Sequence, residues 1–561
     1  MTSQDIVSLS IILVVVFGSA PFLGAYMERV YGGRRHPLSF LGPVERFFYR
    51  LCGIDPETRM DWKKYLFSML AFSAASLTVL FLILLGQGFL PLNPQKIAGM
   101  SWHLAFNTAV SFMTNTNWQS YSGEVSASYF SQTLGLAVQN FLSAAAGMAV
   151  ALALVRGIVS RRKDPADPVP SLGNFWVDMT RSVLYILLPL SCIVAIILVS
   201  QGVVQNFSPY VAALSFEGKQ DLIPMGPAAS QIAIKQLGTN GGGFFGPNSA
   251  FPFENPTPFS NIVEMISLLL IPAGFPFLFG RMAGKKRQGY MLFAVMFALF
   301  GIGLWAAMSS EYSWGTLEGK ELRFGPGMSA AWAATTTVTS NGSVNAMHDS
   351  LSPLAGMVAM INMMLGEVVF GGVGSGLYGI LALVFITVFI AGLMVGRGPE
   401  YLGKKIEAKD VTLAMAAIIA PNFVILVFAA IATVAKAGLA SVTNPGPHGL
   451  TQILYAFSSA AGNNGSAFAG LGVNTPFYNV MIGLGMLIGR FAVIVPMMAI
   501  AGNLAAKKTI PESAGTFRTD TRIFGVLLFS VIIIVAGLTH FLTLILGPVL
   551  EHFLLVRGIL L

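Results

Sequence analysis

The segment Thr239-Asn240-Gly241-Gly242-Gly243 decides the fold, because its composition recurs at three other places in the chain. Each copy is a run of small and amide residues that follows an apolar stretch too short to cross a membrane. Any one copy could be an ordinary turn, but four in matching positions of a repeated unit indicate an internally repeated architecture. We call them tracts 1 to 4 in chain order; the other three are Thr114-Asn115-Thr116-Asn117-Trp118, Thr339-Ser340-Asn341-Gly342-Ser343 and Gly462-Asn463-Asn464-Gly465-Ser466.

The composition around the tracts is that of a membrane protein. Of the 561 residues, 54% are hydrophobic and only 10% are charged, and the mean hydropathy is +0.70. Soluble domains carry roughly 25% charged residues, and a membrane-spanning helix needs about 20 predominantly apolar ones. Ten stretches qualify as spans, at 6–26, 65–88, 132–156, 181–203, 259–281, 290–309, 354–396, 411–437, 475–503 and 523–548.

The distribution of Lys and Arg predicts the orientation of these spans. The five loops that follow odd-numbered spans hold 25 of the 33 basic residues, among them Lys163 and Arg397, whereas the opposite side, with Lys219, holds six. Basic loops face the cytoplasm, so we expect a multi-pass inner-membrane protein with both termini outside. The first span follows Asp5 and precedes basic residues, which is the reverse of a secretory signal, so it should be retained. This topology explains the net charge of +8 without a nucleic-acid partner.

The repeated unit reads helix, half-helix, tract, helix. The predicted fold is therefore an all-α polytopic membrane protein with about ten transmembrane helices and four helix–pore loop–helix repeats around a pseudo-fourfold pore. Pore half-helices are expected at 103–113, 228–238, 328–338 and 451–461. The expected segments are 1–63 (N-terminal extra helix and cytoplasmic loop), 64–163, 164–287, 288–409 and 410–508 (repeats 1 to 4), and 509–561 (C-terminal extra helix).

The residue types of the tracts suit a dehydrated monovalent cation. Irregular backbone at membrane depth is tolerated only when it is buried in protein or lines a wet cavity, and rings of backbone carbonyls can replace the hydration shell of an ion. Gly lets successive carbonyls point the same way, and Thr, Ser and Asn add neutral oxygens and local hydrogen bonds. The tracts contain no carboxylate. Because Mg²⁺ and Ca²⁺ favour carboxylate ligands, the neutral oxygens of the tracts suit a large monovalent ion better. We therefore predict that K⁺ binds along 114–117, 239–243, 339–343 and 462–465.

The seventh apolar stretch is too long for one straight crossing and is rich in glycine. It indicates either close helix packing through small residues or a broken helix whose flexible middle lies under the filter as a gate or tunnel. Glu367 lies in this stretch, and an ionisable residue at membrane depth is a functional candidate by default. It could attract the ion, pair with a base or, if shallow, do neither. The glycines assigned to the gate or tunnel are Gly371, Gly372, Gly374 and Gly376.

Five further polar residues are candidates for supporting roles. Arg490 lies inside the ninth span, where it could pair with a buried carboxylate or repel cations from the inner exit so that they turn sideways into a tunnel. Lys235 precedes tract 2 and is expected to cap its half-helix. Gln119 is expected to support or line the filter entrance. His348 and Asp349 follow tract 3 at the outer mouth, as structural residues or a weak attraction for cations.

Five strings carry a resemblance to a known family. TNTNWQSY (114–121), QLGTNGGGFF (236–245), NAMHDS (345–350), LGEVVFGGVGSGLYG (365–379) and AGNNGSAF (461–468) resemble the potassium-binding (A) subunits of bacterial Kdp potassium-transporting P-type ATPases. The resemblance runs through nearly the whole chain. One departure is Asn341 in tract 3, where the family pattern has a smaller residue; it leaves the role of Gly342 intact.

The resemblance implies a fold and a set of partners. The family belongs to the superfamily of K⁺ transporters built like one-chain, four-repeat potassium channels. Its members work with a P-type ATPase catalytic subunit, an outward-projecting accessory subunit and a small hydrophobic peptide, in contact with membrane lipids, and pass K⁺ through a tunnel to the ATPase subunit. The sequence has no G-x-x-x-x-G-K-[ST] or D-K-T-G string, so we expect no nucleotide to bind this chain and no ATPase chemistry on it.

Two other function classes compete with this interpretation. A self-sufficient channel or gradient-driven cation transporter would need the same filter, so the tracts alone do not separate it from a pump subunit. A membrane enzyme that used His348, Asp349 and Glu367 is poorly supported, because no nucleophile–base or metal-ligand spacing accompanies them. Cys52 and Cys192 lie far apart and match no redox or metal spacing.

Overall fold

The structure is a computed structural model that describes residues 2–162, 168, 170–218, 220–396, 398–511 and 517–559. Three of the basic residues used to predict the orientation, Lys163, Lys219 and Arg397, lie outside these ranges, as does the expected boundary between repeats 1 and 2 at 163.

Within the described residues, ten helices are long and apolar enough to cross a membrane, which confirms the ten predicted spans. Several begin at a side-chain cap that satisfies free backbone N–H groups: Asp61 caps α3, and Thr257, Thr475 and Thr521 cap α10, α18 and α19. The spans are Ser3–Tyr31, Trp62–Phe89, Ser131–Val159, Phe175–Ser200, Pro258–Met282, Lys286–Trp314, Ser375–Val395, Ala408–Val434, Pro476–Ala506 and Arg522–Val556.

The long helices are α1 (Ser3–Tyr31), α3 (Trp62–Gly86), α6 (Val138–Val159), α7 (Phe175–Arg181) continued by α8 (Leu188–Ser200), α10 (Pro258–Met282), α11 (Lys286–Trp314), α14 (Ser375–Val395), α15 (Ala408–Val434), α18 (Pro476–Ala506) and α19 (Arg522–Leu544). The shorter helices are α2 (Gly42–Leu51), α4 (Trp102–Met113), α5 (Gly123–Ser126), α9 (Ala228–Leu237), α12 (Gly325–Val338), α13 (Pro353–Met364), α16 (Lys436–Leu439), α17 (Pro447–Ala461) and α20 (Leu550–Val556). Two small antiparallel hairpins pair β1 (Val211–Leu214) with β2 (Gln220–Ile223) and β3 (Glu400–Tyr401) with β4 (Lys404–Lys405).

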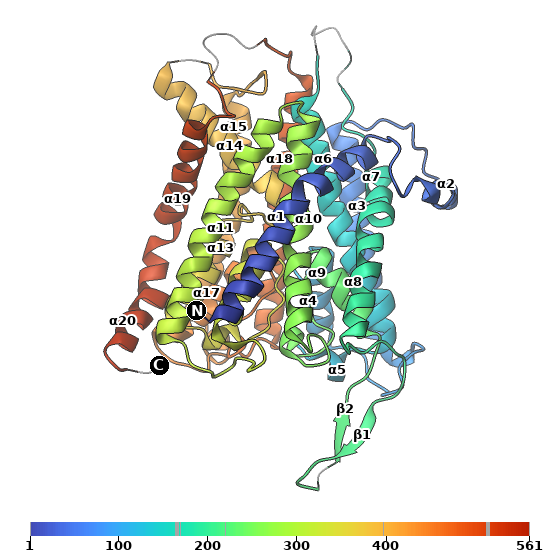
Figure 1. Ribbon diagram of the computed structural model, residues 1–561, viewed down its shortest axis with the longest axis vertical. Helices are drawn as coiled ribbons and strands as arrows, with labels where there is room; N and C mark the ends of the chain where they lie inside the picture. Colours follow the sequence, from blue (N-terminus) through green and yellow to red (C-terminus); the bar gives the residue numbers. More distant parts are fainter. Residues whose placement is uncertain are drawn as a thin grey trace.

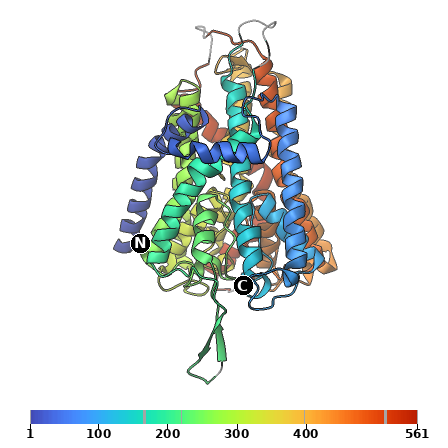
Figure 2. The same cartoon turned by 90° about the vertical axis from the view of Figure 1, so that its right-hand side faces the viewer.

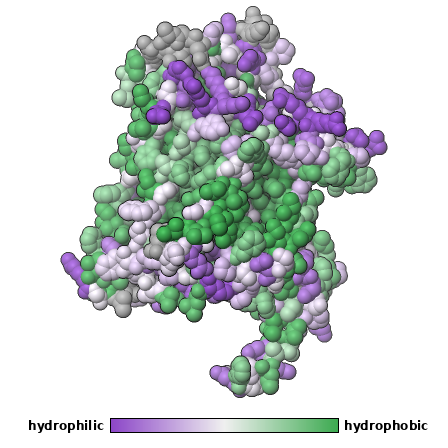
Figure 3. Space-filling model, in the orientation of Figure 1, coloured by the Kyte–Doolittle hydropathy of each residue, from purple (hydrophilic) through white to green (hydrophobic). Residues whose placement is uncertain are grey.

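The long helices run side by side between two different ends of the molecule (Figure 1). Both termini lie toward the end that carries the β1–β2 hairpin, and α4, α9 and α17 lie in that half of the bundle. The amphipathic helix α2 lies across the bundle near the opposite end (Figure 2). A hydrophobic band separates hydrophilic residues at the two ends (Figure 3), as expected for a protein that spans a bilayer. We call the end that carries α2 and the α10–α11 turn the basic end.

The first and last spans, which are predicted to lie outside the four repeated units, pack against helices of those units. Helix α1 packs along α10, and α19 packs against α11, α13 and α14. The α1–α10 contact depends on small residues, because a Cβ on Gly24 would lie 2.8 Å from the carbonyl oxygen of Gly274. Close backbone approach of this kind is how helices associate in lipid.

The seventh apolar stretch is broken, as one of the two interpretations predicted. Helix α13 ends at Met364, the backbone from 365 to 374 is not a continuous helix, and α14 begins at Ser375. The glycines also allow close packing, so the other interpretation holds as well. A Cβ on Gly374 would lie 2.3 Å from the carbonyl oxygen of Gly147, and one on Gly376 would lie 1.5 Å from that of Phe370.

Candidate ion-binding site

The four half-helices end directly at the four tracts. α4, α9, α12 and α17 finish at Met113, Leu237, Val338 and Ala461, each within one residue of the predicted end. Their carboxyl ends, which carry the partial negative charge of the helix dipole, therefore point at the tract residues. Every residue from 114 to 117 and from 239 to 243 is buried, and tracts 3 and 4 are buried except for Gly465.

The backbone of every tract alternates in the same way. Two residues, separated by one, adopt positive φ in each tract, and this alternation turns successive carbonyl groups toward one side of the strand. Four unrelated turns would not be expected to share this pattern at matching positions. The pairs are Asn115 (φ +67°) and Asn117 (+54°), Thr239 (+48°) and Gly241 (+78°), Ser340 (+46°) and Gly342 (+92°), and Asn463 (+45°) and Gly465 (+99°).

Glycines join the tracts into a ring. A Cβ on Gly241 would lie 2.0 Å from the carbonyl oxygen of Asn341, so tract 2 touches tract 3. Gly342 stands in the same relation to the carbonyl of Asn464 (2.1 Å), and Gly465 to that of Thr116 (2.0 Å), so tract 4 returns to tract 1. Gly242 lies against Asn117 and closes the ring between tracts 1 and 2.

One hydrogen bond recurs in all four repeats and fixes each tract to its own half-helix. The residue between the two positive-φ positions of each tract donates its backbone N–H to a carbonyl in the last turns of the half-helix. In the described part of the chain, no donor contacts the carbonyl oxygens of these same four residues. The bonds are Thr116 to Ser111 (2.9 Å), Asn240 to Lys235 (2.8 Å), Asn341 to Thr336 (3.0 Å) and Asn464 to Ser459 (2.9 Å).

Asparagine side chains connect neighbouring repeats behind the ring. Asn341 Nδ2 donates to the Lys235 carbonyl (3.1 Å), and Asn464 Nδ2 donates in the same way to the Thr336 carbonyl (2.9 Å). The departure at Asn341 is therefore accommodated, because its side chain points behind the tract and repeats a contact made in tract 4. In the same layer, Asn115 Nδ2 donates to the Thr239 carbonyl (3.0 Å).

Tract 1 differs from the others because it has Asn117 where they have glycine. Asn tolerates positive φ better than most residues, and Asn117 Nδ2 donates to Asn140 Oδ1 on α6 at 2.6 Å. Gln119 lies just beyond and joins tract 1 to tract 2: its Oε1 accepts the N–H of Gly243 (2.8 Å), and its Nε2 donates to the Gly243 carbonyl (3.0 Å). Gln119 therefore links tracts 1 and 2, and its role at a filter entrance stays a prediction.

A buried polar network stands behind tract 2. Lys235 Nζ pairs with Glu254 at 2.5 Å, and both side chains are completely buried. The ammonium also donates to Asn248 Oδ1 (2.7 Å), while Asn248 Nδ2 donates to the carbonyl of Gly241 (2.7 Å). The expectation that Lys235 caps its half-helix was wrong in detail, because its ammonium turns toward Glu254 and supports the tract through Asn248. The sequence analysis also missed Asn248 and Glu254.

The broken segment between α13 and α14 lies directly against the tracts. Val373 donates its N–H to Thr239 Oγ1 (3.0 Å), and Gly371 donates to the carbonyl of Val338, the last residue of α12 (2.8 Å). The segment also contains two non-glycine residues with positive φ, Glu367 (+56°) and Phe370 (+53°). Strained backbone of this kind persists only where surrounding contacts hold it.

Glu367 and Arg490 line one small cavity next to tract 4. The cavity holds about 20 Å³, room for one water or ion, and Gly462 and Asn463 also line it. Glu367 Oε2 is buried, and the carboxylate interacts with Ser375 and with the backbone of Gly372. Arg490 donates to the Tyr378 hydroxyl (3.3 Å) and acts on Glu367 through its charge rather than through a hydrogen bond. The two candidates are thus brought together, but not as a direct ion pair.

His348 and Asp349 do not face the tracts as a cation-attracting pair. His348 Nδ1 lies 2.8 Å from the Tyr455 hydroxyl, and burial lowers the pKa of His348 to about 3, so the ring is neutral. Asp349 Oδ1 is bonded by His448 (3.3 Å), which also contacts Glu551 (2.8 Å). Burial alone would lower the pKa of His448, but the hydrogen bonds and charges of the two carboxylates raise it to about 9.

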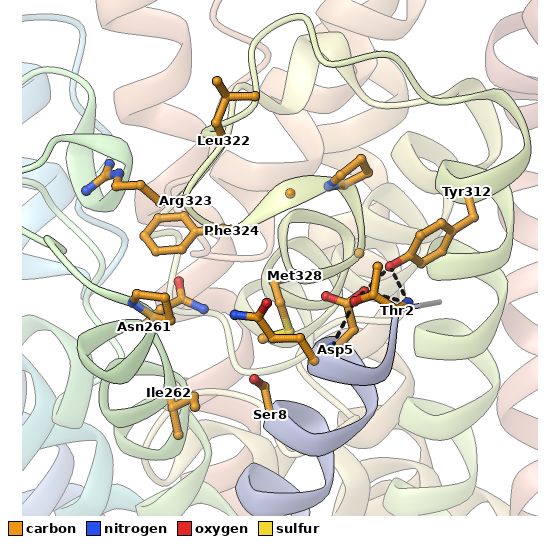
Figure 4. A pocket seen from close by; sticks show the side chains of 15 residues that line it. Thr2, Asp5, Ser8, Asn261, Ile262, Tyr312, Leu322, Arg323, Phe324 and Met328 are labelled. Atoms are coloured by element: carbon orange, nitrogen blue, oxygen red, sulfur yellow. Dashed lines mark hydrogen bonds between the residues drawn. The ribbon is translucent and has the colours of Figure 1, made fainter.

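A second cavity, of about 190 Å³, lies at the start of α12 and contains no tract residue. Figure 4 shows Thr2 and Asp5 from the first turn of α1 beside Tyr312 of α11. Asp5 is 5% exposed, and its Oδ2 accepts hydrogen bonds from Thr2 and Tyr312. The carboxylate adjoins Gly327, in the first turn of α12, where a negative charge stabilises the positive end of the helix dipole.

Comparison with known proteins agrees with this architecture. The ten long apolar helices and four half-helices of the described residues define a polytopic membrane protein. Its fold is that of a K⁺ transporter: the potassium transporter TrkH from Vibrio parahaemolyticus superimposes with a TM-score of 0.52 at 15% identity, over 88% of this chain and 97% of its own. The chain belongs to the potassium-transporting ATPase A subunit family (KdpA), whose family model matches residues 10–553.

Relatives of this family match the chain almost end to end. The protein named potassium-transporting ATPase potassium-binding subunit in Pseudomonas aeruginosa is 55% identical over 565 residues, which cover 98% of this chain and 99% of the relative. Proteins of the same name in Rhodospirillum centenum and Leptospira interrogans are 53% and 52% identical, over 100% and 99% of this chain and 99% of each relative.

Proposed function

We propose that this chain binds extracellular K⁺ in a four-part filter made by the tracts and passes it into the membrane for ATP-driven, high-affinity uptake. The observation that carries the proposal is the ring itself: four backbones with the same alternation of φ, in which glycines touch the carbonyls of neighbouring tracts. Carbonyls that accept no hydrogen bond from the protein are available to replace the hydration shell of an ion.

In this proposal, K⁺ leaves the filter beside the broken segment. Glu367 carries a buried carboxylate oxygen next to tract 4, which would attract a dehydrated cation, and Arg490 in the same cavity would repel it. Together, Glu367 and Arg490 favour a sideways exit of K⁺ over one straight through the bundle. The close-packed floor of the gate or tunnel would be formed by Gly371, Gly372, Gly374 and Gly376. K⁺ is the transported substrate in this scheme.

The division of labour follows from family membership. The relatives are named subunits of a potassium-transporting ATPase, so we assign this chain the role of the non-catalytic, ion-binding subunit. A P-type ATPase subunit would hydrolyse ATP, and an outward-projecting subunit and a small hydrophobic peptide would complete the complex; no nucleotide would bind here. The positive-inside rule supports an orientation in the bacterial inner membrane with the basic end in the cytoplasm and both termini outside.

The proposal is tested by K⁺-stimulated ATP hydrolysis of the purified complex carrying Gly342→Asp or Gly241→Asp. Either side chain would enter a space where even a Cβ meets a carbonyl oxygen within about 2 Å, and the added charge should raise the half-saturating K⁺ concentration or let Na⁺ stimulate. Gly218→Asp is the matched control, because Gly218 also has positive φ (+75°) but nothing within 4 Å of its Cβ position. Unchanged K⁺ dependence in both folded tract variants would refute the filter. K⁺ flux without any dependence on ATP would instead favour a self-sufficient channel or a gradient-driven transporter.

A further inference from the structure

A groove of about 550 Å³ runs between α11 and α19 on the outer surface of the bundle. Its walls come from the first half of α11 and the start of α19, and its floor includes small residues, Ala294, Ala298 and Gly525. A Cβ on Gly525 would be in ordinary van der Waals contact with Met291 and Val295 (3.7 Å to each), so α11 and α19 approach each other at this point. The volume is within the range of sites that hold one small-molecule ligand.

The groove changes character along its length. Its inner part is apolar, whereas Arg287 and Arg522 stand at the basic end, both exposed. A second cavity of about 460 Å³ continues from there and shares Arg287 and Asp520 with the groove. It adds Lys285, Lys286 and Arg518, against the carboxylates of Glu400 and Asp520.

The charge at this end is positive even after the acids are counted. Asp520 is already paired with Arg518 (3.3 Å), so it does not neutralise Arg287 or Arg522. Helices α11 and α19 also both begin here, and the positive ends of their dipoles add to the field. An apolar channel that opens into a positive patch at the membrane surface has the polarity of one molecule of anionic phospholipid.

We propose that this groove is a binding site for a diacyl anionic phospholipid. The phosphodiester lies between Arg287 and Arg522, and an acyl chain follows the apolar floor along α11 and α19. Basic pockets between transmembrane helices select anionic headgroups in this way. A partner helix would fill the apolar part equally well but would leave the two guanidinium groups without an anion, which is why the lipid is the favoured occupant.

The test is photocrosslinking of the purified complex with phosphatidylglycerol that carries a diazirine in one acyl chain. The expected result is labelling of the α11 and α19 segments that line the groove, and much weaker labelling by phosphatidylcholine with the same acyl chains. Each basic residue near a membrane surface contributes about fivefold to anionic-lipid binding, so Arg287→Gln with Arg522→Gln should weaken labelling about 30-fold. Inorganic phosphate in excess should not compete, because it has no acyl chain.

Two further variants make the result decisive. Arg281→Gln is the matched control, because Arg281 is an exposed arginine at the same end that does not line the groove. Ala298→Phe fills the apolar floor and should abolish labelling while both arginines remain. Equal labelling by the two lipids, or insensitivity of the labelling to the double arginine variant, would overturn the proposal.

Discussion

The ion pair between Lys235 and Glu254 allows a test that separates the stability of the fold from the geometry of the filter. Breaking a buried ion pair by removing one partner costs about 3–5 kcal/mol, because the other charge remains buried. Both side chains here are completely buried, so Lys235→Met should lose stability of that order. This is a large part of the roughly 5–15 kcal/mol that stabilises a typical domain.

The double variant Lys235→Met with Glu254→Gln should recover most of that stability, because no charge is left unpaired. The amide oxygen that replaces the Glu254 carboxylate can still accept the N–H of Phe245, a 2.8 Å bond in the wild type. What the double variant cannot restore is the contact from Lys235 that holds Asn248 against the Gly241 carbonyl. One such hydrogen bond is worth about 1 kcal/mol, so the half-saturating K⁺ concentration should rise about fivefold while the melting temperature stays near that of the wild type.

Thermal unfolding and K⁺-stimulated ATP hydrolysis of the same preparations provide the two readouts. Lys320→Met is the matched control, because Lys320 and Glu311 form another fully buried pair (2.7 Å) that contacts no tract residue. It should lower the melting temperature and leave K⁺ dependence unchanged. Wild-type K⁺ dependence in the stable double variant would show that the network behind tract 2 serves folding alone.

Three further predictions concern stability, each measured as the melting temperature of the purified complex. His448→Gln should remove a stabilising contribution of about 3 kcal/mol, because the folded-state pKa of His448 is raised from 6.5 to about 9. In the wild type that contribution is complete below pH 6.5 and is lost as pH rises through 9. A wild-type melting temperature that does not fall over this range would contradict the prediction. Gly374→Ala should lower the free energy of unfolding by about 2–4 kcal/mol through its clash with α6. Gly366 also has positive φ but open space around its Cβ position, so Gly366→Ala should cost only about 1 kcal/mol. Equal losses of stability in the two variants would refute the packing argument. Asp5→Asn should cost about 1 kcal/mol by weakening the charge at the start of α12, and an unchanged melting temperature would exclude that role.

The sequence predicted the spans, the half-helices and the break in the seventh span because each depends on residues that are close together in the chain. The length of an apolar run and the position of a glycine-rich segment are local properties. The ring of tracts could be suspected from repetition, but which carbonyl each glycine touches could not be. Gly342 meets a carbonyl more than a hundred residues away, and nothing in the composition of either tract specifies that pairing.

The network behind tract 2 was missed for a related reason, although a signal existed. Between Asp221 and Glu264 the only charged residues are Lys235 and Glu254, and two lone opposite charges in an apolar region must either pair or bear a large desolvation cost. Their pairing could have been inferred from that argument. The role of Asn248 could not, because it depends on a turn with positive φ (+56°) that aims the amide at tract 2.

The differences between the repeats support the proposed lateral exit from a one-chain filter. A ring of four identical chains would repeat any break below the filter four times, and the ion would then meet the same surroundings in every direction. As far as the described residues show, only the third unit is broken, between α13 and α14, and the cavity beside tract 4 brings Glu367 and Arg490 together. Tract 1 likewise keeps Asn117 where the others need glycine. In the proposed function, the ring would remain nearly fourfold where K⁺ is dehydrated, while the structure beneath it differs from side to side. That asymmetry would give a departing ion a preferred direction.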